Sequence, residues 1–113
     1  MAKGVKIGEC VVERFRGKPV IVMPTEGRPF SFGVAKAQAV LAHRDMVQAF
    51  AEGRIDDIFG VDTIGEFKGH LILMVPLGNG FDFRFGQVKA ALVVAHWVEI
   101  EEFVAQFGEE DEA

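Results

Sequence analysis

Residues 30–43 read FSFGVAKAQAVLAH, and residues 83–96 read FRFGQVKAALVVAH. In each stretch two phenylalanines flank a polar residue, a glycine follows, and an apolar pattern of helical spacing begins. Alternation with a period of two predicts a strand, whereas apolar residues spaced three or four apart predict a helix. The glycine permits a sharp turn between the two. Repetition of the whole pattern predicts an internal duplication, and self-similarity of this kind decides the architecture.

The match extends before and after these stretches. FRGKPVIVM (Phe15–Met23) corresponds to FKGHLILMV (Phe67–Val75), and similar apolar positions recur in the two helices. We expect each copy to form a three-stranded antiparallel meander, because its strands are joined by short connections, and then a helix. The first copy covers about residues 5–53 and the second about residues 61–107.

The expected elements follow from the apolar pattern and from the Gly and Pro residues that interrupt it. In the first copy they are strands Lys6–Arg16, Pro19–Met23 and Arg28–Phe32 and a helix from Val34 to Glu52, ended by Gly53. In the second copy they are strands Thr63–Lys68, His70–Leu77 and Phe81–Phe85 and a helix from Gln87 to Phe107, ended by Gly108. Between the copies, residues 54–62 are expected to pack rather than to form a loose tether. The helical apolar stripes are predicted at Ala37, Val40, Leu41, Val47, Phe50 and Ala51, and at Val88, Leu92, Val93, Ile100, Phe103, Val104 and Phe107.

One meander with one helix covers a single face of its sheet and leaves both sheet edges open. Two such units can cover each other about a twofold axis, as the subunits of symmetric dimers do. The predicted fold is therefore α+β, with two tandem β-meander-plus-helix repeats packed about a pseudo-twofold axis into one domain. This domain covers residues 1–108, and residues 109–113 form an acidic tail. We expect that neither half folds alone.

Composition limits the partners and the compartment. The 113 residues have a net charge of −5, but all 12 Lys and Arg precede residue 98, so the body is weakly positive and the C-terminal segment strongly negative. Such asymmetry is typical of an acidic, solubilising tail. The single cysteine excludes an internal disulfide and favours a reducing, cytoplasmic setting. The longest apolar runs are shorter than the ~20 residues of a membrane span, so no membrane association is expected.

Candidate catalytic and metal-binding residues are few. His43 and His96 occupy equivalent helix positions, where a pair of imidazoles could bind a metal or transfer protons. Each lacks a second His, Cys or carboxylate at ligand spacing within its own copy, so packing or helix-surface roles are the favoured interpretation. His70 is an isolated strand residue, and Ser31 lacks the local motif of a catalytic nucleophile. We therefore predict no enzyme activity, no metal and no cofactor.

Each helix begins with a glycine and has a lysine in its first turn, namely Gly33 with Lys36 and Gly86 with Lys89. Helix N-termini attract anions through unpaired N–H groups and the helix dipole. The spacing matches neither a P-loop nor a dinucleotide fingerprint. A solvated lysine is the favoured interpretation, and a small-molecule or anion site is the weakest of three functional hypotheses.

Basic residues on the strands and their turns are the main candidates for binding. Arg14 and Arg16 are expected on the face of the first strand that no helix covers, opposite Val11, Glu13 and Phe15. Together with the corresponding residues of the second copy they form a basic, partly apolar surface of the kind that binds single-stranded nucleic acids. The candidate contacts are Arg14, Arg16, Lys18, Lys68 and Arg84.

This layout resembles the PUR-repeat proteins and is similar to the Whirly and transcriptional-coactivator single-stranded-DNA-binding proteins. The resemblance rests on the duplicated order of sheet and helix and on the two hairpins, Phe15–Met23 and Phe67–Val75. It implies helices that pair the two copies and a β-surface that binds single-stranded DNA or RNA. The family has four strands in each copy, and Lys6–Arg16 is long enough to form two.

Two functional hypotheses lead. The first is a non-catalytic protein that binds single-stranded DNA or RNA with the helix-free sheet face. The second is a protein-interaction or homodimerisation module that binds no nucleic acid.

Overall fold

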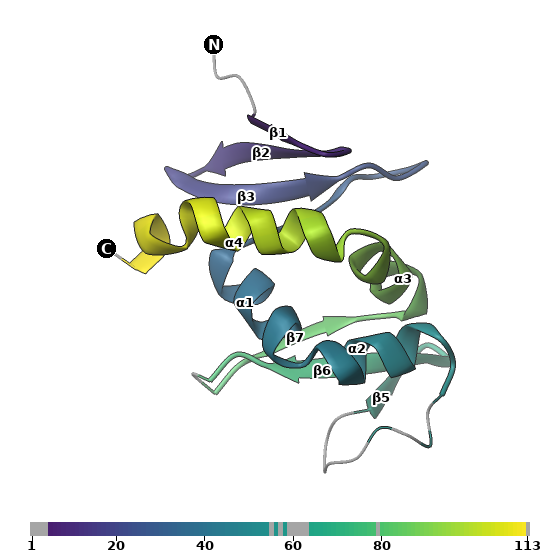
Figure 1. Cartoon of the computed structure of the whole chain (residues 1–113). Coiled ribbons are helices and arrows are strands. Elements are labelled where there is room, and N and C mark those ends of the chain that lie inside the picture. The colour runs from purple at the N-terminus through teal and green to yellow at the C-terminus, as the bar shows by residue number, and fades with distance from the viewer. Residues whose placement is uncertain (1–4, 55, 57, 59–63, 79, 113) are drawn as a thin grey trace. The chain divides into compact units, whose positions relative to one another are not determined.

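The computed structural model describes residues 5–54, 56, 58, 64–78 and 80–112, with side chains through residue 108. Within these residues the fold is mixed α+β, as predicted, with four helices and two antiparallel sheets (Figure 1). The interval 54–62, expected to pack, lies outside the described residues except for residues 54, 56 and 58. Among the described residues, none of the helices is long and apolar enough to span a membrane.

The first sheet has four strands in sequence order. They are β1 (Val5–Ile7), β2 (Cys10–Phe15), β3 (Lys18–Met23) and β4 (Phe30–Gly33). The prediction of one strand over Lys6–Arg16 is therefore wrong, and the observation that this segment is long enough for two is confirmed, because the chain turns at Gly8 and Glu9. Gly8 has φ +59°, a left-handed conformation that glycine adopts at little cost. The turn pairs Ile7 with Cys10 and adds a fourth strand to the expected three.

The second sheet has three strands, as predicted. They are β5 (Ile64–Phe67), β6 (His70–Pro76) and β7 (Asp82–Phe85), and they follow one another as an antiparallel meander. In both sheets a strand containing two phenylalanines is the last one, and these rings meet edge to face. The ring centroids lie 5.4 Å apart for Phe30 and Phe32 and 4.9 Å apart for Phe83 and Phe85.

Each predicted long helix is broken into two. The helices are α1 (Val34–Ala42), α2 (Arg44–Ala51), α3 (Gln87–Ala95) and α4 (Trp97–Glu112). The residue between the helices is His43 in the first pair and His96 in the second. His43 has φ −115° and ψ 36°, outside the helical region, so the regular helix is interrupted there. Neither break contains Pro or Gly, and the apolar periodicity therefore did not predict it.

Both glycines expected to end helices were tested by the structure. Gly53 ends α2 as predicted: its φ is +81°, and its N–H donates to the carbonyl of Phe50. Gly108 does not end its helix, because α4 continues to Glu112. The start of the predicted acidic tail, residues 109–112, is thus helical.

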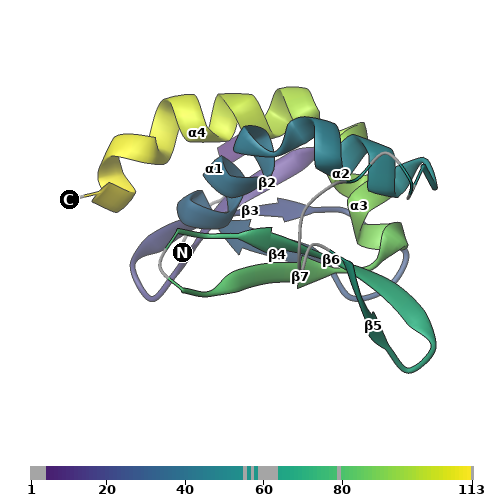
Figure 2. The same cartoon turned by 90° about the horizontal axis from the view of Figure 1, so that it is seen from below.

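The chain divides into two compact units that do not coincide with the predicted repeats. The first unit combines Met1–Gln38 with His96–Ala113, and the second is Ala39–Ala95. In the first unit α4 packs on β1 and β3, so a C-terminal helix covers a sheet formed near the N-terminus (Figures 1 and 2). Its core includes Ile21, Met23, Phe32, Ile100 and Phe103, all at most 4% exposed.

In the second unit α2 packs against α3, and α3 contacts β6. Its core includes Phe50, Leu73, Val75, Phe85 and Val93. The residues predicted for the apolar stripes of the helices are all buried or half-buried except Val88, which is 80% exposed.

The predicted faces of the strand containing Arg14 and Arg16 are exchanged in the structure. Cys10 and Val12 are buried, whereas Glu13 and Phe15 are exposed. Arg14 shares the face of Val12, and its guanidinium carbon lies 5.9 Å from the ring centroid of Phe107 in α4. Because Val11 and Val12 are both apolar, the sequence does not show which face of this strand is buried. The buried face is the one on which α4 packs.

The left-handed conformation of Gly53 leads to a simple stability prediction. A Cβ at this position has room, with its nearest neighbour, Gln87 Nε2, at 3.7 Å, so only backbone strain opposes a side chain. Gly53→Ala is expected to lower the free energy of unfolding by about 1 kcal/mol in urea denaturation. Gly27→Ala is the matched control, because it has open space and no positive φ, and should change the stability by less than about 0.5 kcal/mol. Equal losses of stability in the two variants would contradict the left-handed conformation of Gly53.

Candidate functional site

Two hairpin turns share an uncommon backbone conformation. In the first, Phe15 pairs with Lys18 across a turn formed by Arg16 and Gly17, with φ values of 55° and 81°. A two-residue turn with positive φ at both central residues is a type I′ turn.

The second hairpin repeats this arrangement. Phe67 pairs with His70, and the turn residues Lys68 and Gly69 have φ values of 52° and 83°. Arg16 and Lys68 are the only positive-φ residues other than glycine in the part of the chain that the structure describes.

The left-handed conformation is costly for a long side chain. It costs residues other than Gly, Asn and Asp roughly 1–2 kcal/mol, which is why Asn-Gly is preferred in such turns. Here the first turn position holds Arg16 in one hairpin and Lys68 in the other. Residues strained in this way are concentrated at functional sites. The shared property of the two side chains is their positive charge.

An exposed aromatic ring lies beside each of these cations. Phe15 is 61% exposed and Phe67 is 60% exposed. The guanidinium carbon of Arg16 lies 5.2 Å from the Phe15 ring centroid, and Nζ of Lys68 lies 5.3 Å from the Phe67 ring centroid. Both distances are within the range of a cation–π contact. Each turn therefore presents a flat apolar ring together with a positive charge.

In the first unit, the tip of the β2–β3 hairpin gathers one aromatic and two basic residues, whereas the predicted contact Arg14 lies apart from them. Phe15, Arg16 and Lys18 meet at the tip of the β2–β3 hairpin, and Lys18 is exposed. Arg14, predicted on the same surface, lies on the face that α4 covers. Its Nη1 donates a hydrogen bond of 3.4 Å to the carbonyl of Gly17, so it braces the turn from the other side.

In the second unit Lys68 lies at a hairpin tip, whereas Arg84 lies on β7. Arg84 pairs with Met74 across the sheet, and its Nη2 lies 3.7 Å from Oδ2 of Asp82. The pair is exposed, and ion pairs at the surface contribute little stability. Arg84 therefore remains accessible to an anion that competes with Asp82, but its positive charge is partly balanced.

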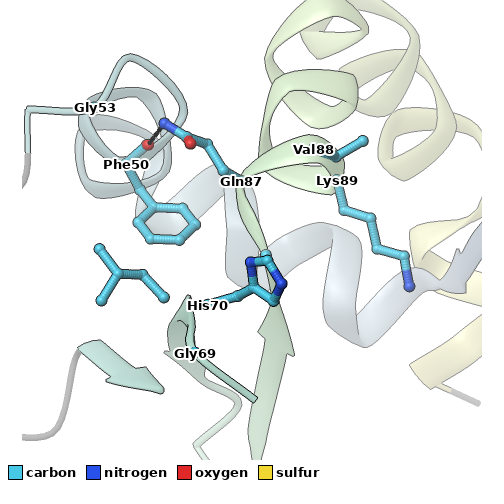
Figure 3. Close-up of a pocket in the computed structure, with 9 residues that line it drawn as sticks. Phe50, Gly53, Gly69, His70, Gln87, Val88 and Lys89 are labelled. Carbon is cyan, nitrogen blue, oxygen red and sulfur yellow. Dashed lines mark hydrogen bonds between the residues drawn. The ribbon is translucent and has the colours of Figure 1, made fainter. Parts of the chain in front are cut away.

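A cleft of about 660 Å³ adjoins the second hairpin (Figure 3). One wall is formed by Gly69, His70 and Leu71, which follow Lys68 in the chain. The opposite wall includes the end of α2 and the start of α3, where Nε2 of Gln87 donates a 3.3 Å hydrogen bond to the carbonyl of Phe50. The remaining lining residues are Gly53, Gly86, Val88 and Lys89. The predicted anion position at Gly86 and Lys89 thus forms part of a larger, mainly apolar cleft.

A third arrangement was missed by the sequence interpretation. Cys10, His96 and Glu99 place one potential ligand atom each within 4.8 Å of one another. The prediction that His96 lacks a second potential ligand in its own copy is wrong, because Glu99 lies one helical turn further on. Spacing of His and Glu at i and i+3 was a usable signal. The approach of Cys10 depends on the packing of α4 on the N-terminal sheet, and no local pattern predicts it.

The electrostatic surroundings of this group are unusual. Burial, together with the charges of Glu99 and Glu9, raises the pKa of the Cys10 thiol to about 11. Burial also acts to raise the pKa of Glu99. Hydrogen bonds from the backbone N–H groups of Glu99 and Glu9, with the neighbouring His96 ring, outweigh this effect and lower that pKa below its usual value.

Comparison of the chain with protein-family models, with curated proteins and with solved structures gives no match.

Proposed function

We propose that this protein is a non-catalytic single-stranded nucleic-acid-binding protein that uses its two hairpin tips and the adjoining sheet surface. The observation that carries the proposal is the recurrence of one exposed arrangement, a phenylalanine beside a cation in a left-handed turn position. Single-stranded nucleic acids bind where bases stack on aromatic rings and phosphates meet Lys or Arg. Each hairpin tip supplies both components.

Exposure and strain support this function over a purely structural role. An exposed phenylalanine loses the hydrophobic stabilisation of about 1.5–3 kcal/mol that burial would give. A left-handed Arg or Lys adds a further cost, and Asn or Gly would avoid it. In both hairpins the exposed phenylalanine lies next to the left-handed Arg or Lys, as is expected if a ligand binds there.

The proposal agrees with the expectation drawn from the resemblance to PUR-repeat and Whirly-like proteins. Under it, the chain is a duplication in which each repeat contributes one binding hairpin. Phe15, Arg16 and Lys18 are the proposed contacts of the first hairpin, and Phe67, Lys68 and His70 those of the second. Arg84 adds a phosphate contact on β7, and Arg14 acts as the brace of the first turn. The cleft beside His70 is of a size to receive an unstacked base.

A titration with a fluorescently labelled single-stranded oligonucleotide tests the proposal. The protein should bind at low salt and lose affinity steeply at moderate salt, because binding releases counterions from the phosphates. A blunt duplex of the same sequence should bind more weakly, since its bases are not free to stack. Absence of binding at micromolar protein would contradict the proposal.

Replacing the turn cations by asparagine separates binding from folding. In the double variant Arg16→Asn with Lys68→Asn, relief of left-handed strain offsets the lost cation–π contact, each about 1 kcal/mol, so stability should change little. The slope of log affinity against log salt should become shallower by about 0.7 for each phosphate contact removed. Urea denaturation and the oligonucleotide titration measure the two effects on the same samples.

The matched control removes two charges elsewhere on the surface. Lys36→Gln with Arg54→Gln lowers the net charge equally, and both residues are exposed and outside the hairpins. This control should bind more tightly than the asparagine variant. Equal losses in the two variants would indicate a general charge effect and contradict a hairpin site.

The alternative function is a protein-interaction or homodimerisation module. It is favoured by apolar side chains that remain exposed outside the hairpins, chiefly Val88 at 80% and Val98 at 75%. This alternative predicts that the mass measured by light scattering rises with protein concentration and that no oligonucleotide binds.

A further inference from the structure

Three potential metal ligands converge in the first compact unit from distant parts of the sequence. Cys10 opens β2, His96 lies at the break before α4, and Glu99 lies in the first turn of α4. One sulfur, nitrogen or oxygen atom of each lies within 4.8 Å of those of the other two. Modest side-chain adjustments would bring the atoms to the distances at which a single ion of tetrahedral preference is bound.

The imidazole of His96 provides a second and independent indication of a ligand. The residue is only 6% exposed, and its Nδ1 makes no hydrogen bond among the residues that the structure describes. Nδ1 nevertheless lies 3.4 Å from Oε2 of Glu99, so it is directed into the group. A buried polar atom without a hydrogen bond is costly, and buried polar atoms in native proteins nearly always have partners. A bound cation would satisfy this nitrogen.

The turn between β1 and β2 holds the carboxylate of Glu99 in place. The N–H of Glu9 lies 3.4 Å from Oε2 of Glu99 and donates to it. A Cβ on Gly8 would lie only 2.5 Å from the same oxygen, so the glycine leaves the space that the carboxylate occupies. Backbone donors that orient a ligating carboxylate are typical of the surroundings of metal sites.

The kinds of donor atom identify the class of metal. Thiolate and imidazole together favour zinc among the common divalent metals, and carboxylate oxygen is its third usual ligand. Calcium and magnesium prefer sites made of oxygen atoms alone. Three protein ligands leave a fourth position for water. Glu99 keeps 16% of its side chain exposed, which gives the ion and this water an approach from solvent.

We propose that Cys10, His96 and Glu99 bind one zinc ion, which fastens α4 to the sheet that it covers. On binding, a zinc–sulfur bond replaces the sulfur–hydrogen bond of Cys10, and the proton leaves to solvent. His96 binds as the neutral imidazole and Glu99 as the carboxylate. Because the ligands join the two separated segments of the first unit, the ion stabilises that unit against opening.

Cobalt(II) absorption spectroscopy on the metal-free full-length protein tests the site directly. Titration with Co²⁺ should give a thiolate-to-cobalt charge-transfer band that saturates at one equivalent and disappears when Zn²⁺ is added. Zinc should also raise the melting temperature progressively with its concentration. Absence of the charge-transfer band would overturn the proposal, because Cys10 is the only cysteine in the chain.

Three variants define the ligand set. Cys10→Ser should abolish the charge-transfer band, and Glu99→Gln should weaken Zn²⁺ binding at least tenfold. Glu102→Gln, an exposed substitution on the same helix, should bind as the unaltered protein does. Glu99 is partly exposed and glutamine keeps its size, so this variant remains informative if Cys10→Ser does not fold. Unchanged zinc affinity in Glu99→Gln, or equal losses in Glu99→Gln and Glu102→Gln, would overturn the assignment.

Discussion

Phe103→Ala is expected to lower the free energy of unfolding by about 3–5 kcal/mol, the range found when a buried phenylalanine is truncated. Phe103 is fully buried in the first compact unit, where α4 packs on β1 and β3. Truncation leaves a cavity between α4 and the N-terminal sheet on which it packs. Since domains of this size are stable by only about 5–15 kcal/mol, the loss should be visible as a much lower urea midpoint.

Val98→Ala is the matched control on the same helix. Val98 is 75% exposed, so its truncation should change the stability by less than about 0.5 kcal/mol. Both variants should be measured by circular dichroism during urea denaturation. A loss below about 1 kcal/mol for Phe103→Ala would mean that α4 does not cover the sheet as described.

Phe15→Ala with Phe67→Ala is expected to weaken binding of a single-stranded oligonucleotide by about 1–3 kcal/mol for each ring removed. The rings are more than half exposed, so their loss should affect the stability far less than it affects binding. Because the cations at the two turns remain, the salt dependence should stay close to that of the unaltered protein. Reduced affinity at an unchanged salt slope is the distinguishing result.

Phe81→Ala provides the control for this experiment. Phe81 is 69% exposed but lies outside the two cation-bearing hairpins, just before β7. Its removal should leave oligonucleotide binding within about twofold, a change of about 0.4 kcal/mol. If Phe81→Ala weakens binding as much as the double variant, the binding surface is not the pair of hairpin tips.

The sequence predicted the kinds of elements well because their local signals are strong. Alternating phenylalanines marked β4 and β7. The predicted strands left Gly17 and Lys18 for the first tight turn, whereas the structure forms it from Arg16 and Gly17. Gly53 was recognised as a helix end from the preference of that position for a left-handed residue. Each of these features depends on a few adjacent residues, and local physics fixes it.

What the sequence did not predict depends on contacts between distant segments. The inward face of β2 was assigned wrongly, because Val11 and Val12 fit either face until α4 selects one. The breaks at His43 and His96 interrupt continuous apolar patterns, and neither contains the Pro or Gly that would mark a break in the sequence. Gly108 was taken as a stop, yet it is buried within α4.

The candidate sites also differ in whether local sequence or contacts between distant segments form them. Arg16, Lys18 and Lys68 were predicted as contacts on a basic sheet surface, and the structure places them at the two hairpin tips. Arg14 was expected on the face that no helix covers but lies on the face of α4, and the exposure of the Phe15 ring was not expected. The group formed by Cys10, His96 and Glu99 requires the folded first unit, so only its His-Glu half could be seen in the sequence.

The first compact unit is assembled from the two ends of the chain, whereas the second is continuous in sequence. During synthesis on the ribosome the N-terminal sheet therefore emerges long before the helix that covers it. Residues 39–95 are synthesised before the helix that covers the apolar face bearing Ile21 and Met23. Because domains generally fold as units during synthesis, the first unit is completed only after α4 has emerged. Loss of α4 would leave the apolar face of the first sheet uncovered in every such chain.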